Sequence, residues 1–215
     1  TYRIKIAVYS QLDGFALNLY YLSGWNQSRV NMNIFNAIEN GDFYQAITCL
    51  EAGVDVNQIG IGGLTPLMHA CCAGNIDMIR ILIEDYNADV NVINSKGYSP
   101  LLWSCMLGEA GAADVLINEF GADVNKVSPD GMTPLIMAAR LNHLRIGELL
   151  IDAGAHLDAC DYRGKTAFEI ALEKGNYKMV ELLLPEPLND PEDGPPFAEA
   201  LECLGSYITF IYDLL

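Results

Sequence analysis

A three-residue motif, Thr-Pro-Leu or a close variant, recurs along the chain at an almost fixed spacing. It stands at residues 65–67, 99–101 and 133–135, and in the altered form Thr-Ala-Phe at residues 166–168. Successive starting positions differ by 34, 34 and 33 residues. A period of this size is typical of stacked repeat units, because each unit buries its apolar surface mainly against its neighbours.

Each motif has the chemistry of a helix start. A Thr or Ser side chain at the N-cap accepts a hydrogen bond from the first turn, and Pro fits the first helical position because its φ is already fixed. Two residues earlier stands a glycine, as a tight turn with positive φ requires. Nine residues after each cap stands Gly or Asn, the residue types that end helices in the left-handed conformation. The pattern therefore predicts a short first helix in every repeat.

A second motif keeps the same phase. An apolar-periodic segment such as residues 76–83 predicts a second helix. It leads into Asp-Val-Asn at residues 55–57, 89–91 and 123–125, and into a weaker His-Leu-Asp at residues 156–158. These triplets are again 34, 34 and 33 residues apart.

The Gly-x-Thr-Pro-Leu start, the helix pair and the Asp-Val-Asn end closely resemble the ankyrin repeat, over about residues 33–184. The resemblance implies an all-α solenoid of stacked antiparallel helix pairs, with β-turn fingers along one edge. The chain departs from the family where a His commonly follows Thr-Pro-Leu. Other residues stand at those positions: Met68, Leu102, Ile136 and Glu169.

The motifs also predict how the chain is divided. We expect a capping repeat at residues 33–57, followed by repeats at 58–91, 92–125, 126–158 and 159–184. Within the array, the second helix of the middle repeat is predicted to be the weakest, because it contains Gly111.

Three segments flank this array. Residues 1–32 are an apolar flank, expected to cover the first repeat or to form a separate module. Residues 185–196 hold five of the nine prolines and predict a linker. Residues 197–215 predict an apolar helix that covers the last repeat or binds a partner. The chain begins at Thr1 rather than at Met, as a segment of a longer protein would.

The net charge of −16 disfavours two classes of partner. With no run of Lys or Arg, the chain would be repelled by nucleic acid and by anionic membrane surfaces. No apolar run of transmembrane length is present in the sequence, so membrane insertion is not expected. The six cysteines lack metal-ligand spacing. Cys71 and Cys105 are expected to be core fillers in a reducing compartment, the cytoplasm or the nucleus, while Cys72 is expected to react first.

No catalytic arrangement is predicted. His69, His143 and His156 stand at non-equivalent repeat positions, without a nucleophile or carboxylate at a known spacing. No glycine-rich loop ends in Lys-Ser or Lys-Thr. We therefore expect no enzyme activity, no metal and no cofactor.

The family resemblance implies a partner-binding surface made of finger tips, the residue after each turn glycine, and the ends of the first helices. Leu64, Tyr98 and Met132 follow successive turn glycines and are expected to form an exposed apolar ladder that Lys165 continues as a charge. Arg140, Arg163, Lys165 and Lys174 are expected to form a basic edge. The full mapping selects Ile61, Leu64, Cys72, Lys96, Tyr98, Met106, Leu107, Asp130, Met132, Arg140, Leu141, Tyr162, Arg163 and Lys165.

The expected function is binding of an extended or helical segment of another protein, as scaffold, adaptor or inhibitor. Two alternatives are a regulatory or targeting segment of a larger enzyme or channel, and a module that binds its own C-terminal helix. The resemblance also implies candidate hydroxylation sites at Asn57, Asn91 and Asn125.

Overall fold

The computed structural model describes residues 33–60 and 62–184. Helices, turns and loops make up these ranges, with one isolated antiparallel bridge between Cys160 and Thr166. The expected all-α solenoid is confirmed. The predictions for residues 1–32, 185–196 and 197–215, and for Ile61, lie outside the described residues. The chain divides into two compact units, residues 1–54 and residues 55–215, which we describe separately.

The described part of the first unit is a single helix pair, α3 (Ile34–Glu39) and α4 (Phe43–Glu51). The side chain of Asn33 caps α3 by accepting a hydrogen bond from Phe35 N–H, and that of Asp42 caps α4 by accepting one from Gln45 N–H. Both helices thus begin at polar caps of the usual type, although the Thr-Pro-Leu start is missing here.

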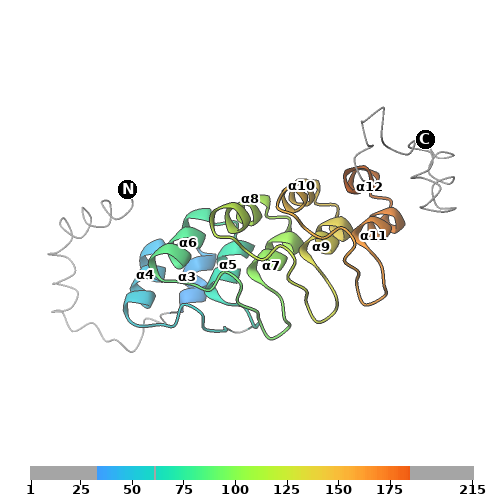
Figure 1. The fold of residues 1–215 in the computed structure, drawn as a ribbon. Helices are drawn as coiled ribbons and strands as arrows, with labels where there is room; N and C mark the ends of the chain where they lie inside the picture. Colours follow the sequence, from blue (N-terminus) through green and yellow to red (C-terminus); the bar gives the residue numbers. More distant parts are fainter. Residues whose placement is uncertain (1–32, 61, 185–215) are drawn as a thin grey trace, which may run out of the picture. The chain divides into compact units, whose positions relative to one another are not determined.

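The described part of the second unit, residues 55–60 and 62–184, consists of helix pairs arranged in two rows (Figure 1). The first helices form one row, and the connecting loops project from their side. They are α5 (Pro66–Cys72), α7 (Pro100–Leu107), α9 (Pro134–Leu141) and α11 (Ala167–Lys174). The second helices form the other row: α6 (Ile76–Arg80) continued by η1 (Ile81–Asp85), α8 (Ala110–Asp114) continued by η2 (Val115–Glu119), α10 (Leu144–Asp152) and α12 (Tyr177–Leu183).

The predicted caps of the first helices are present. The hydroxyl oxygens of Thr65, Ser99 and Thr133 each accept a hydrogen bond from the backbone N–H three residues later, at 3.2–3.3 Å. In the last repeat, Thr166 does the same while the Glu169 carboxylate accepts from Thr166 N–H at 2.8 Å. Glu169, a departure from the family pattern, thus completes a reciprocal capping box.

The difference between 34-residue and 33-residue repeats has a structural cause. In the two longer repeats, the second helix widens into a π-helical turn, η1 or η2, whereas α10 of the shorter repeat remains α-helical. The chain then closes each repeat with an equivalent bond, from Ala88 N–H to Leu82 C=O and from Ala155 N–H to Leu150 C=O. The first bond spans one residue more than the second, and the π turn accommodates that residue.

Small residues occupy the tightest positions of the first helices. Cys71, Cys105 and Ala139 are equivalent in register and fully buried. The expectation that the first two are core fillers is confirmed. Cys72, one residue further along α5, is only half-buried.

Candidate partner-binding surface

Each finger of the second unit is a tight hairpin closed by two backbone hydrogen bonds. In the finger that precedes α7, Gly97 N–H donates to Asn94 C=O and Asn94 N–H donates to Tyr98 C=O, at 2.9 and 3.1 Å. Gly97 adopts φ +76°, and a Cβ there would lie 2.3 Å from Pro129 Cδ of the next finger. Glycine is therefore required for the turn and for the close approach of two fingers.

A buried polar side chain fixes the conformation of each later finger. Asn94 Oδ1 accepts hydrogen bonds from Lys96 N–H and Tyr98 N–H, both at 2.9 Å. In the last finger, Asp161 Oδ1 accepts from Arg163 N–H and Lys165 N–H, at 2.8 and 3.0 Å.

Asp161 keeps its charge although it is buried. Burial favours the neutral form, but the backbone bonds from Lys165 and Arg163 and the charges of Arg163 and Arg140 outweigh it. The pKa of the Asp161 carboxyl is therefore lowered from its ordinary value.

The asparagines of the Asp-Val-Asn triplets join successive repeats. Asn57 Oδ1 accepts from Asp89 N–H at 2.9 Å, and Asn91 Oδ1 accepts from Asp123 N–H at 2.9 Å. Asn125 extends the series, because its Oδ1 accepts from His156 N–H at 2.8 Å. These contacts give the asparagines a structural role. Their hydroxylation stays a prediction.

Tyr98 connects two fingers rather than standing free. Its hydroxyl donates to Asp130 Oδ2 at 3.2 Å, and its ring meets Trp103 edge to face with centroids 6.0 Å apart. Burial, followed by the Asp130 charge, raises the pKa of the Tyr98 hydroxyl, which therefore stays protonated as a donor at neutral pH. Tyr98 is half-buried, as is Leu64 one repeat earlier.

The expected exposure of Met132 is wrong. Its relative exposure is 1%. Its Sδ lies 3.6 Å from Nη1 of Arg140, and its N–H donates to Ser128 Oγ at 3.1 Å. The last finger also lies close, because a Cβ on the adjacent Gly131 would be 2.7 Å from Tyr162 N. The predicted ladder of Leu64, Tyr98 and Met132 is therefore not a continuous exposed surface.

A different set of apolar side chains is exposed at a repeating finger position. Ile59, Ile93 and Val127 are 56%, 49% and 55% exposed. They stand 34 residues apart, each two residues after the asparagine of an Asp-Val-Asn triplet. We call these three residues the finger ladder. Their recurrence at the repeat period is visible in the sequence, but the predicted set of site residues does not include them.

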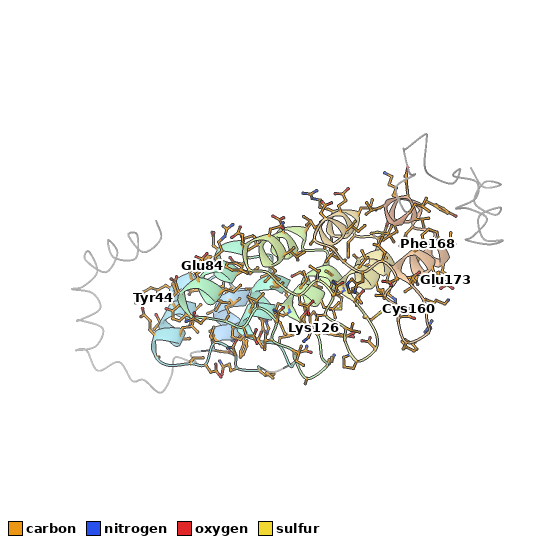
Figure 2. The ribbon with its side chains drawn as sticks, viewed as in Figure 1. Tyr44, Glu84, Lys126, Cys160, Phe168 and Glu173 are labelled. Atoms are coloured by element: carbon orange, nitrogen blue, oxygen red, sulfur yellow. The ribbon has the colours of Figure 1, made fainter. Side chains whose placement is uncertain are left out.

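The next position in the register of the finger ladder is Cys160. It is exposed and lies in the last finger (Figure 2).

The ends of the first helices carry further exposed side chains. Leu107 and Leu141 are equivalent in register and both largely exposed, whereas Met106 is half-buried. All three belong to the partner-binding surface predicted from the sequence, as does Cys72, which is half-buried.

The expected basic edge is only partly available. Lys165 forms a salt bridge with Glu173, and Arg140 is half-buried beside Met132. Arg163 remains exposed, with its Nε donating to the Tyr162 hydroxyl at 2.7 Å and its guanidinium 5.1 Å from the Tyr162 ring centroid. Of the other selected residues, Lys96 and Asp130 are exposed.

No group of three or more His, Cys, Asp and Glu side chains in residues 33–60 and 62–184 could hold a metal ion. Within the same ranges, every helix is too short or too polar to span a bilayer.

Comparison with known proteins agrees with this architecture. The sequence matches the family described as ankyrin repeats (3 copies) over residues 34–128 and again over residues 112–193, which together make up well over half of the chain. The chain belongs to the ankyrin repeat family. Ankyrin repeats are generally protein–protein interaction modules, and ankyrin repeat proteins are generally non-catalytic.

One relative is a fowlpox virus (strain NVSL) protein named as an ankyrin repeat protein, FPV223. It is 36% identical over 55 residues, a stretch that covers 26% of this chain and 39% of the viral protein. The match therefore spans about two fifths of the length of this relative.

Proposed function

We propose that this ankyrin repeat chain binds an extended or helical segment of another protein along its fingers, as a scaffold, adaptor or inhibitor. The observation that carries the proposal is the finger ladder of Ile59, Ile93 and Val127. Single exposed aliphatic residues are ordinary, but three at one register position of successive fingers form a repeated surface feature.

The contacts between fingers support a rigid binding surface. The asparagine bonds from Asn57 to Asp89 and from Asn91 to Asp123 join the segments that enter successive fingers. A preorganised surface loses little conformational entropy on binding. Covering one half-exposed Ile or Val contributes on the order of 1 kcal/mol, so the finger ladder supplies about 3 kcal/mol.

The last finger supplies a polar contact. Arg163 is exposed and stacked on Tyr162, a pairing that suits a partner carboxylate. The favoured partner segment therefore has aliphatic side chains along the finger ladder and an acidic residue toward the last repeat. We also propose that the protein resides in a reducing compartment, the cytoplasm or nucleus. This proposal is supported by Cys71 and Cys105, which are buried in the core as free thiols.

The test compares proteins retained from a native-cell lysate by immobilised full-length variants. Ile93→Glu places a charge in the finger ladder and should reduce retention of the specific partner at least tenfold, which corresponds to about 1.4 kcal/mol. Asn118→Glu places the same charge on the exposed surface of η2 in the same repeat and should leave retention unchanged. The proposal is overturned if both variants retain the wild-type set, or if both lose it.

Once a partner is purified, binding kinetics separate the apolar and polar contributions. Ile93→Ala should mainly accelerate dissociation, whereas Arg163→Glu should slow association and reduce its dependence on salt. Unchanged kinetics in both variants would assign the partner to another surface.

A further inference from the structure

The last repeat exposes positions that every earlier repeat of the second unit buries. Phe168 on α11 is half-exposed, whereas the equivalent Leu67, Leu101 and Leu135 are almost completely buried. Figure 2 shows Phe168 at the end of the row of helices, near α12. Each earlier first helix contacts the first helix of the repeat that follows: α5 contacts α7, α7 contacts α9, and α9 contacts α11.

Two further positions on this end behave in the same way. Leu172 on α11 is half-exposed, although the equivalent residues of the preceding repeats, Cys71, Cys105 and Ala139, are fully buried. Leu182 on α12 is half-exposed, while its equivalents Ile81, Val115 and Leu149 are buried. We call Phe168, Leu172 and Leu182 the end face. Terminal repeats usually present a polar outer surface, so three large apolar side chains here indicate a cover.

The end face does not fit another repeat stacked in the same register. Earlier repeats place Cys or Ala where Leu172 stands, and a larger side chain would overpack that contact. Earlier repeats also bury Met68, Leu102 and Ile136 at the position of Glu169. Stacking a repeat there would bury the Glu169 carboxylate, which is strongly unfavourable. The cover therefore has a different shape from a repeat.

We infer that residues 197–215 of this chain cover the end face as a C-terminal cap. This segment has large apolar residues at steps of three or four, as a helix with one apolar side requires. They are Phe197, Leu201, Leu204, Ile208, Ile211 and Leu215.

Length and charge favour this occupant. Residues 185–196 join the segment to the last described residue, Leu184, and a proline-rich stretch of that length reaches about 37 Å at roughly 3.1 Å per residue. The tether keeps the segment at an effective concentration in the millimolar range. Residues 185–215 contain acids but no Lys or Arg, whereas Lys174 and Lys178 are exposed on α11 and α12.

Hydrogen exchange measured by mass spectrometry on the full chain tests the inference. In the wild type, amides of residues 197–215 should exchange at least tenfold more slowly than an unstructured peptide. Leu172→Glu should abolish this protection. Leu141→Glu, which changes an exposed leucine at the end of α9, should leave it intact.

A second variant guards against simple misfolding. Leu201→Glu alters the segment itself, so it should remove the same protection while exchange in α5 to α10 stays at the wild-type rate. The inference is overturned if residues 197–215 exchange freely in the wild type, or if Leu141→Glu has the effect expected of Leu172→Glu. It is also overturned if light scattering finds a dimer that Leu172→Glu dissociates while residues 197–215 exchange freely, because the end face would then bind a second copy.

Discussion

The side-chain oxygen of Asn91 accepts a hydrogen bond from the backbone N–H of Asp123, 2.9 Å away, and so joins two successive repeats. The same residue receives local support, because Asn91 N–H donates to Asp89 Oδ1 at 2.9 Å. Each triplet thus holds its own turn with the Asp and the next repeat with the Asn. Repeat arrays depend on nearest-neighbour contacts, so these bonds act where the array is most sensitive.

Asn91→Ala should lower the free energy of unfolding by about 1–2 kcal/mol, because Asp123 N–H loses its acceptor. Chemical denaturation followed by circular dichroism measures the loss. Asn118→Ala is the matched control. The Asn118 side chain donates a hydrogen bond to Asp114 on the exposed surface of its own repeat, so its replacement should cost less than about 0.5 kcal/mol. Equal losses would show that the bond between repeats contributes no more to stability than the Asn118 contact within one repeat.

Replacing the two helical glycines of the second row by alanine should change the stability of the protein in different ways. A Cβ on Gly111 would lie 3.5 Å from Ile76 Cδ1, an ordinary contact. Gly111→Ala should therefore stabilise the protein by about 0.5–1 kcal/mol, because alanine loses less backbone entropy in a helix. A Cβ on Gly147 would lie 3.1 Å from atoms of Leu182 and Met179, so Gly147→Ala should gain less or destabilise. Denaturant midpoints of both variants measure these changes in stability. A larger gain in stability from Gly147→Ala than from Gly111→Ala would contradict the packing described.

The Arg80–Glu119 pair should make stability depend on pH. Arg80 Nε and Nη2 donate to the two carboxylate oxygens of Glu119, at 2.9 and 2.6 Å, and join α6 to η2. The hydrogen bond from Arg80 lowers the pKa of Glu119 from its ordinary value of 4.5. Because the folded-state pKa is the lower one, the pair's stabilisation is complete above the unfolded-state pKa and is lost as pH falls through the folded-state value.

Denaturation of wild type and Glu119→Gln across pH measures this contribution. The two midpoints should differ at neutral pH and converge as pH falls below the lowered folded-state pKa of Glu119, where its carboxylate protonates. Glu148→Gln is the control, because Arg145 and Glu148 are neighbours on α10 and connect no second repeat. A difference that persists unchanged in strong acid would assign the effect to something other than the ion pair.

The features that were predicted correctly from the sequence depend on residues close together along the chain. The Thr and Ser caps, the first-row prolines and the small buried cysteines follow from residue type and register, and the structure confirms them. The 34- and 33-residue spacings implied an extra residue in the longer repeats, but spacing alone cannot say where it lies. Its place in η1 and η2 follows from the fixed contacts on either side of the second helix.

The candidate site was less predictable because exposure depends on distant residues. Met132 stands at the same motif position as Tyr98, yet Arg140 and the last finger bury it. The motif contains no information about either contact. By contrast, Ile93 of the finger ladder recurs at the repeat period, so the sequence carried the signal for the exposed surface.

Thiol labelling tests, for each cysteine separately, whether its side chain is exposed or buried. Cys72 was predicted to react first, but the structure favours Cys160, which is exposed while Cys72 is half-buried. Burial raises the pKa of the Cys71 thiol to about 12, so this thiol stays protonated and shielded even at about pH 9. Cys105 is likewise buried, and burial raises its pKa.

Among the cysteines of residues 33–60 and 62–184, iodoacetamide should therefore alkylate Cys160 first in the native protein and Cys72 more slowly, while Cys71 and Cys105 remain unmodified until denaturant is added. Mass spectrometry of individual peptides resolves each site, and the fully denatured protein gives the control rates. Labelling of Cys71 at the rate of Cys160 in native protein would mean that α5 opens readily. The rigid fingers on which the proposed binding surface depends would then lose their support, because α5 begins directly at the Thr65 cap that ends the first finger.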